Sequence, residues 1–508
     1  MLLMGLDVGT TSVKAAVFDC EGRQISLASA RTRVSFPAPG QAEQEASRVW
    51  AALLSVTREA ALASGGEPIA AMSLSTQGDA VVPVDGNGQA LSLFHLGMDY
   101  RCQPHAEAFA NEFGGYELFR RTGMRPHAIN TLCKIRCIRE TMPEIRQNAA
   151  AYRTYTDYLL ALLGAEQAVI DLTMASRTMA MAVNDTVWDG ELVEAAGIKP
   201  GQLSKPVASG TVVGQLSRSA AESIGAPCAL SEQTLLVAGA HDQVCAAVGA
   251  GVVRPGMALD SHGTAEVVSR VLDTPCLTRA MYGAGFPCYR FAGEGRWFTF
   301  SLNHAAGLLL RHFAGTYCAE ERARADVSGE DLFDLILGGA ASKPTNLIIL
   351  PYLNGRGTPI NDQGLTGLIA GLTLSTSRAE IARAILESLA YDMLANLDAA
   401  EAAGFHTSSL RCVGGGARGR LNLSIKADVT GREAVTLAHP EAACFGAALL
   451  AGIGAKAFDS VDDAARLARV RNIIQPDPQR HAYYSGRYEL FNQFYERSHD
   501  LLKQAAVR

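Results

Sequence analysis

Residues 4–11 read Met-Gly-Leu-Asp-Val-Gly-Thr-Thr, and residues 257–265 read Met-Ala-Leu-Asp-Ser-His-Gly-Thr-Ala. Each stretch begins as a short apolar run that is typical of a β-strand, and each ends in a glycine turn that carries hydroxyl groups. A second β-like run follows in both places, over residues 13–19 and from Val267 onward. Because the second copy lies near the midpoint of the chain, with one residue inserted, the sequence predicts a duplicated domain.

Strand and helix signals alternate along the rest of the chain. Apolar runs that predict strands lie at residues 69–73, 80–84, 235–238 and 347–350. The clearest helix begins with a capping box from Ser377 to Glu380, and Gly404 ends it. This alternation predicts an α/β fold. Three glycines and a proline at residues 249–256 interrupt the pattern, so we expect one domain over residues 1–250 and a second over residues 251–508.

Composition excludes several classes of protein. The 508 residues carry a net charge of −6 with no basic stripe, which argues against nucleic acid or an anionic membrane as the partner. A hydrophobic content of 48% excludes a disordered chain. The eleven cysteines include no CxxC pair, which favours reduced thiols and a cytoplasmic protein. The N-terminus lacks the basic start of a signal peptide, and the longest apolar run, residues 443–455, is shorter than the ~18 residues of a membrane span.

The first glycine turn has the chemistry of a phosphate-binding loop. Glycine lets the backbone approach a ligand, the amides of a tight turn point at oxygen atoms, and hydroxyl and ammonium groups add donors. The candidate residues are Gly9, Thr10, Thr11, Ser12 and Lys14. Asp7, at the mouth of the turn, would hold a metal ion through water. The alternative is an ordinary hairpin with a polar turn.

Two further glycine segments are candidates for nucleotide binding. Gly263 and Thr264 form the second copy of the hydroxyl-bearing turn, and facing the first they would provide a second phosphate clamp. Residues 413–418 read Val-Gly-Gly-Gly-Ala-Arg after a predicted strand, and glycine there would let a flat adenine ring lie on the backbone of Gly415, Gly416 and Ala417. The alternatives are a plain turn and glycines that serve only helix packing.

Asp242 is the candidate for acid–base chemistry. It follows the apolar run at 235–238, and the carboxyl ends of buried strands are where α/β proteins place their sites. A carboxylate there would accept a proton from a substrate hydroxyl. The alternative is that Asp242 caps the helix that follows.

These features resemble one family. Residues 367–372 read Gly-Leu-Ile-Ala-Gly-Leu, and seven residues later 380–387 read Glu-Ile-Ala-Arg-Ala-Ile-Leu-Glu. This pattern resembles the C-terminal signature of the FGGY carbohydrate kinases at every position that the signature constrains. Residues 351–355, 414–418 and 441–450 also resemble segments of that family, in its order and at its spacing.

The resemblance implies two duplicated ribonuclease H-like domains with a central cleft, as in the actin, hexokinase and heat-shock ATPase group. It implies ATP and Mg²⁺ as cofactors, Asp242 as catalytic base and a further candidate metal contact, and Asp7 as the residue that organises Mg²⁺. The implied substrate-binding residues are Gln77, Gly78, Asp79, Asp99, Arg101 and Gln243. The family often forms homodimers, so a homodimer is also expected.

Three departures concern the sugar. Cys137 and Gly97 stand where the family often has tryptophan, and Arg356-Gly357 replaces a more common Glu-Arg. Some segments resemble the xylulose kinase branch and others the fuculose and rhamnulose branches, so the expected substrate is a small ketose or polyol. The alternatives are a catalytically weak sugar or nucleotide sensor, an ATP-driven chaperone, and an acetate-kinase-like acyl phosphotransferase.

Overall fold

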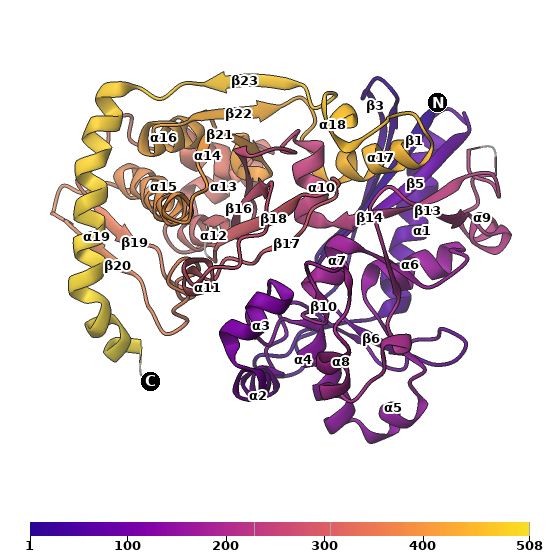
Figure 1. Cartoon of the computed structure of the whole chain (residues 1–508). Coiled ribbons are helices and arrows are strands. Elements are labelled where there is room, and N and C mark those ends of the chain that lie inside the picture. The colour runs from indigo at the N-terminus through magenta and orange to yellow at the C-terminus, as the bar shows by residue number, and fades with distance from the viewer. Residues whose placement is uncertain (228, 305, 507–508) are drawn as a thin grey trace.

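The computed structural model describes residues 1–227, 229–304 and 306–506 and contains two large mixed sheets, one in each half of the chain (Figure 1). The six-stranded N-terminal sheet has the order β13-β14-β5-β1-β2-β3. Its strands are β1 (Leu2–Val8), β2 (Ser12–Asp19), β3 (Gln24–Arg31), β5 (Ile69–Thr76), β13 (Val212–Gln215) and β14 (Leu235–His241).

The seven-stranded C-terminal sheet has the order β17-β18-β16-β15-β21-β22-β23. Its strands are β15 (Gly256–His262), β16 (Glu266–Leu272), β17 (Tyr289–Arg290), β18 (Trp297–Asn303), β21 (Thr407–Val413), β22 (Glu433–Leu437) and β23 (Val470–Ile474). The remaining described strands form two-stranded pairs: β4 (Glu43–Gln44) with β7 (Phe94–His95), β6 (Val82–Val84) with β8 (Ala151–Arg153), β9 (Val169–Asp171) with β12 (Lys205–Val207), β10 (Met181–Ala182) with β11 (Val187–Trp188), and β19 (Ile348–Leu350) with β20 (Leu368–Ala370).

The pairing of strands confirms the predicted duplication. β1 pairs antiparallel with β2 on one side and parallel with β5 on the other, and β15 pairs in the same way with β16 and β21. The quoted repeat therefore forms the central strand of each sheet and the turn that follows it. The expected strand at residues 347–350 forms as the buried β19, but its partner is only the short β20, outside both large sheets.

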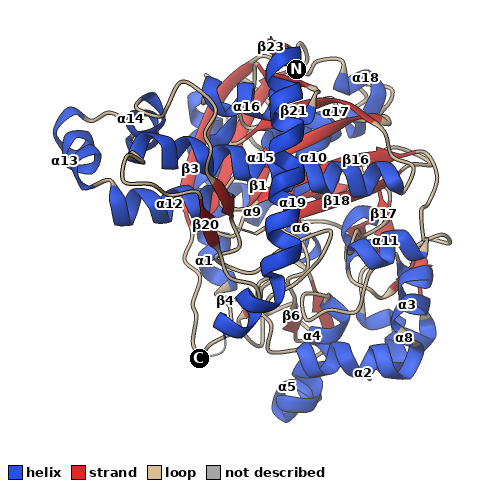
Figure 2. Ribbon diagram, turned by 90° about the vertical axis from the view of Figure 1, so that its left-hand side faces the viewer, coloured by secondary structure: helices blue, strands red, loops and turns tan. Residues whose placement is uncertain are grey.

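Helices cover both faces of the sheets (Figure 2). In the N-terminal half they are α1 (Ala46–Ala63), α2 (Gln103–Phe113), α3 (Gly115–Thr122), α4 (Thr131–Thr141), α5 (Pro143–Asn148), α6 (Tyr155–Leu163), α7 (Leu172–Arg177), α8 (Gly190–Ala195), α9 (Arg218–Ile224) and α10 (Asp242–Gly249). In the C-terminal half they are α11 (Arg279–Ala284), α12 (Ala306–Tyr317), α13 (Ala319–Ser328), α14 (Leu332–Gly338), α15 (Arg378–Ala402), α16 (Arg420–Thr430), α17 (Ala442–Gly454), α18 (Val461–Ala465) and α19 (Pro478–Ala506). The capping box predicted for α15 is present at Ser377 and Glu380.

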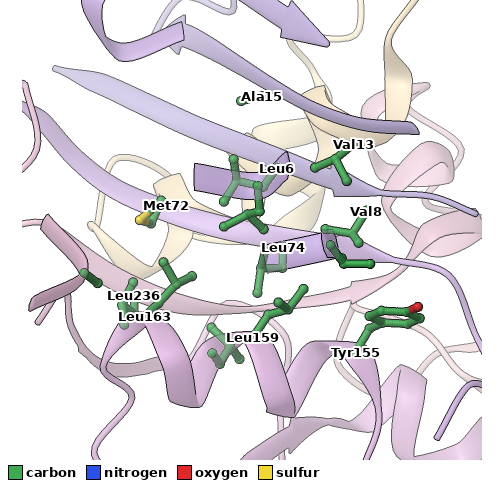
Figure 3. Close-up of a cluster of buried hydrophobic side chains, with 14 of the residues drawn as sticks. Leu6, Val8, Val13, Ala15, Met72, Leu74, Tyr155, Leu159, Leu163 and Leu236 are labelled. Carbon is green, nitrogen blue, oxygen red and sulfur yellow. The ribbon is translucent and has the colours of Figure 1, made fainter. Parts of the chain in front are cut away.

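One face of the N-terminal sheet packs on α6. Figure 3 shows Leu6 and Leu74 pointing from the sheet toward Leu159 and Leu163 of that helix, and all four side chains are buried.

Arg356, one of the departures from the family pattern noted above, has a structural role. Its buried guanidinium lies 4.1 Å from the ring centre of Tyr495, so it helps to hold α19 against the body of the protein.

The opposite face of the N-terminal sheet is covered by a helix from the other half of the chain. α17 packs on β1, β5 and β14, and it crosses α10 at very close range (Figure 1). A Cβ atom on Gly446 would lie 1.8 Å from the carbonyl oxygen of Cys245, and one on Gly249 would lie 2.0 Å from that of Ala442. Glycine is required at this crossing because the two backbones touch.

No helix in the described ranges is both long and apolar enough to cross a bilayer. The ten cysteines described there are all free thiols, as the absence of CxxC pairs predicted.

Replacing Gly446 with alanine tests the helix crossing. We expect Gly446→Ala to lower the free energy of unfolding by at least ~2 kcal/mol, because the new methyl group overlaps a backbone carbonyl that cannot move alone. Gly486→Ala in α19 is the matched control, since nothing lies within 4 Å of its Cβ position. The control should be neutral or stabilising by up to ~1 kcal/mol. Urea unfolding of both variants measures the difference, and equal stability would contradict the close-contact account.

Candidate functional site

The first predicted turn links β1 to β2 at the end of the central strand. The backbone N–H of Gly9 donates to the carbonyl of Ser12 at 3.0 Å, which closes the turn, and Thr11 is exposed at its tip. The hydroxyl of Thr10 donates to Gln77 Oε1 at 2.9 Å. Gln77, which is predicted to bind substrate, therefore also connects the turn to the segment after β5 through this hydrogen bond.

Asp7 is the second-last residue of β1, directly before this turn. Its Oδ1 accepts a hydrogen bond of 2.8 Å from the hydroxyl of Ser75. Burial raises the pKa of Asp7 above its ordinary value, and the bond from Ser75 and the charge of Lys14 offset only part of that rise. Lys14 Nζ lies 2.5 Å from Glu441 Oε2, so the predicted phosphate ligand is held by a carboxylate from the other half of the chain.

Asp242 is the first residue of α10, directly after β14. Residue 241 takes the capping position, so the alternative of Asp242 as a helix cap is wrong. Burial, and after it the charge of Asp7, raises the pKa of Asp242 to about 7. Its Oδ1 accepts the backbone N–H of Gln243 at 2.6 Å, and the side chain stays 32% exposed. The carboxylate is thus held in place, open to a ligand and close to half-protonated at neutral pH.

The second turn and the glycine triplet line one cavity of about 370 Å³ in the C-terminal half. Its walls include Gly263, Thr264, Leu310, Leu337, Gly415 and Gly416. This combination of apolar side chains and backbone has the size and chemistry of a site for a flat ring with a phosphate tail. Ala417, the remaining residue predicted here, lines a neighbouring cavity of about 490 Å³.

The glycine triplet also has a packing role that the sequence did not reveal. A Cβ atom on Gly416 would lie 2.3 Å from Cγ of His262, whereas nothing lies within 4 Å of the Cβ position of Gly415. Glycine at 416 therefore makes room for the buried imidazole of His262, which forms the floor of the cavity.

His262 belongs to a buried charge cluster with Asp260, Glu266 and Lys426, which we call the Lys426 cluster. Lys426 Nζ lies 2.7 Å from Glu266 Oε1 and 3.0 Å from His262 Nδ1, and it also pairs with Asp260. Burial lowers the pKa of Lys426, but the two carboxylates raise it above its ordinary value. Asp260, His262 and Glu266 are close enough together to ligate a metal, but the ammonium already supplies the positive charge. The sequence did not reveal Lys426, although the repeat shows that Asp260 is the equivalent of Asp7.

The substrate-binding residues predicted around residue 79 surround a second residue that was missed. Asp79 is buried with φ of +67° and forms an ion pair with the buried Arg177 of α7. One oxygen of Asp79, Oδ1, and two guanidinium nitrogens, Nε and Nη1, have no hydrogen-bond partner in the described ranges. Unpaired buried polar atoms of both kinds are expected where a polar ligand completes the site. Gln243, whose buried Oε1 also lacks a partner there, belongs to the same set.

Asp99 and Arg101 are held by each other. Asp99 is fully buried and accepts the N–H groups of Ala42 and Arg101, and the Arg101 guanidinium also binds Glu43 at 2.7 Å. Gly97 has a structural reason to replace tryptophan, since its Cβ position lies 3.2 Å from the carbonyl oxygen of Gly78. Asp99 and Arg101 therefore support each other, and their contact with a substrate stays a prediction.

Comparison with known families decides the assignment. The N-terminal domain of the FGGY family of carbohydrate kinases matches residues 2–249, and its C-terminal domain matches residues 258–455. The chain belongs to the FGGY family. The two matched segments of this FGGY kinase contain β1, all but the first two residues of β15, the turns that follow both strands, and Asp242.

Relatives of this FGGY kinase have different names. It is 27% identical to a gluconokinase of Bacillus subtilis over 91% of this chain and 89% of that one. It is 25% identical to a xylulose kinase of Staphylococcus epidermidis (98% and 97%) and 28% identical to an autoinducer-2 kinase of Escherichia coli (97% and 94%). The crystal structure of xylulose kinase from Rhodospirillum rubrum superposes with a TM-score of 0.87 at 25% identity, covering 99% of this chain and all of that one. These likenesses confirm the predicted fold of two actin-like ATPase domains.

The side chains fit the cofactors that the family uses. The cavity bounded by Gly263 and Gly416 would take the adenosine, and the exposed Thr11 and Thr264 carry hydroxyls suited to phosphate oxygens. After burial, the charge of Asp7 is the next cause of the raised pKa of Asp242, and a hard divalent cation near the two carboxylates would relieve that repulsion.

The glycine triplet offers a matched pair of variants. Without nucleotide, Gly416→Ala should lower the melting temperature by several degrees because the methyl group collides with His262, and Gly415→Ala should leave it unchanged. Thermal unfolding of the two nucleotide-free variants measures this. A destabilised Gly415→Ala beside an unaffected Gly416→Ala would contradict the packing role given to His262.

Proposed function

We propose that this FGGY kinase transfers the γ-phosphoryl group of ATP to a hydroxyl of a small, uncharged ketose or polyol, with Asp242 as the general base. The observation that carries the proposal is the setting of Asp242, a fixed and partly exposed carboxylate whose pKa is about 7. A base with that pKa accepts a hydroxyl proton at neutral pH and releases it afterwards.

The nucleotide would be held by both halves of the chain. Gly9, Thr11 and Ser12 would bind the phosphates from one side, and Gly263 and Thr264 from the other. Mg²⁺ bound through Asp7 would neutralise phosphate charge, which is the main requirement of a loose phosphoryl-transfer transition state. Because Lys14 is paired with Glu441, we assign it to balancing that carboxylate, with phosphate as a second partner.

The charges around the substrate end favour a neutral molecule. The Arg177 guanidinium is paired with Asp79, and that of Arg101 with Asp99 and Glu43. Neither cation is left to neutralise a substrate carboxylate. A paired Asp79 and Arg177 instead offer an acceptor beside two donors, which suits neighbouring hydroxyl groups. This favours a ketose or polyol over an aldonate such as the substrate in the name of the Bacillus relative.

Phosphoryl transfer would then proceed by positioning. Asp79 and Arg177 orient the hydroxyls, Asp242 takes the proton of the attacking one, and the oxygen attacks the γ-phosphorus as ADP leaves. Closure of the two halves would exclude water and limit wasteful hydrolysis of ATP.

Replacing the base tests the mechanism. Asp242→Asn should lower kcat at least ~10³-fold, since general base catalysis contributes 10²–10⁴-fold and the proton then has no acceptor. The affinity for ADP, measured by calorimetry, should stay near that of the wild type. An asparagine variant with nearly full turnover would rule out Asp242 as the base.

A substrate panel tests the charge argument. ADP release with Mg·ATP should be stimulated by a ketose or polyol of about four to six carbons and much less by aldonates. Arg177→Met should raise the KM for that sugar at least ~10-fold while leaving the KM for ATP unchanged. Sugar binding without turnover would indicate a sensor, and turnover of acetate alone would indicate an acyl phosphotransferase. Preference for an aldonate would overturn the assignment of a neutral substrate.

A further inference from the structure

His241 lies between Asp242 and a tyrosine from the other half of the chain. The hydroxyl of Tyr289 in β17 lies 3.1 Å from His241 Nδ1, and His241 Nε2 lies 3.1 Å from Asp242 Oδ1. Tyr289 is completely buried, and His241 is 5% exposed. The three polar groups therefore form a continuous row that crosses from the C-terminal sheet to the candidate base.

The protons of this row have one consistent arrangement. Burial raises the pKa of Tyr289 well above its usual value, so the phenol keeps its proton. A neutral ring that accepts the Tyr289 hydroxyl at Nδ1 carries its own proton on Nε2, the nitrogen that faces Asp242.

The surroundings fix the imidazole in this position. The backbone N–H of His241 donates to the hydroxyl of Thr173 at 2.7 Å. A Cβ atom on Gly78 would lie 2.8 Å from His241 Nε2, so the glycine at 78 leaves the space that the ring occupies. Tyr289 is held by edge-to-face contact with Phe298 and by the Arg177 guanidinium 5.3 Å from its ring centre.

The row also distinguishes the two oxygens of the base. Asp242 Oδ1 accepts the N–H of Gln243 and lies beside His241 Nε2. Asp242 Oδ2 makes no hydrogen bond within the described ranges. Since Oδ1 is bound by the Gln243 N–H and lies 3.1 Å from the imidazole, Oδ2 is the oxygen left to receive the proton of a substrate hydroxyl.

We propose that Tyr289 and His241 are positioning residues for phosphoryl transfer, acting in series to hold Asp242 with Oδ2 toward the substrate. The inference rests on the proposed function, since it takes Asp242 as the base. Tyr289 belongs to the sheet that also carries the second phosphate turn, so the direction of the base is set by the nucleotide-binding half. The backbone N–H of Arg290 donates to the Ser176 hydroxyl at 3.1 Å and fixes the same junction.

Removing the tyrosine hydroxyl tests the row. Tyr289→Phe should lower kcat about tenfold, equivalent to ~1.4 kcal/mol of transition-state stabilisation, because His241 loses the bond that orients it. The KM values for sugar and ATP should change less than twofold. Tyr282→Phe is the matched control, because Tyr282 also lies at a contact between the halves and its hydroxyl makes no hydrogen bond in the described part of the chain. The control should keep full kcat.

A double-variant cycle separates positioning from simple packing. In a His241→Gln background, Tyr289→Phe should have almost no further effect on kcat, because both variants break the same series. Additive losses would overturn the proposal, as would full kcat in Tyr289→Phe. If Tyr289→Phe fails to fold, as seen by its melting curve and ADP binding, His241→Gln alone decides: an unchanged kcat overturns the proposal, and a fall in kcat at constant KM for ATP supports it.

The outcomes also separate this inference from the proposed function. Loss of activity in Asp242→Asn together with full activity in Tyr289→Phe removes the positioning role and leaves the base in place. Full activity in Asp242→Asn removes both.

Discussion

The contact between α10 and α17 is the constraint on which the rest of the structure depends. At this crossing the backbones meet through Gly249 and Gly446, with no side chain between them. α10 begins with the candidate base, and α17 follows Glu441, which binds Lys14 of the first turn. The same two helices therefore fix the distance between the base and the turns, and any thickening of the crossing would displace the chemistry at its end.

Charge compensation is the second organising principle of the site. In the N-terminal half, burial raises the pKa values of both Asp7 and Asp242, and the charge of Asp7 raises that of Asp242 further. At the proposed substrate end, Asp79 is paired with Arg177. In the function proposed above, a site built this way would hold a cation with its phosphates at one end and uncharged hydroxyls at the other. The net charge of −6 is compatible with the proposed anionic ligand, because backbone amides and a metal ion would meet the phosphates without a broad basic surface.

Local signals made much of this predictable from the sequence. The two glycine turns, the buried strand before Asp242 and the capping box of α15 each depend on residues close together in the chain, and all are present. The predicted roles of Asp99 and Arg101 look different in the structure, because only the fold shows that they bind each other. Arg177, Lys426 and Tyr289 were missed for the same reason, since each meets its partner across 48 to 166 positions of sequence. No local pattern marks such a pair.

The Lys426 cluster has a consequence for how the duplicated halves diverged. Asp7 and Asp260 occupy matching places in the repeat, but Asp7 is bound by the hydroxyl of Ser75, whereas Asp260 is buried against the ammonium of Lys426. A counter-ion that is a side chain of the same protein cannot diffuse away. Asp260 therefore has a permanent counter-ion, whereas Asp7 is hydrogen-bonded to a neutral hydroxyl. The two halves keep the same central strand and turn, but only the second neutralises its carboxylate within the fold, and the first leaves it for the Mg²⁺ ion that we propose there.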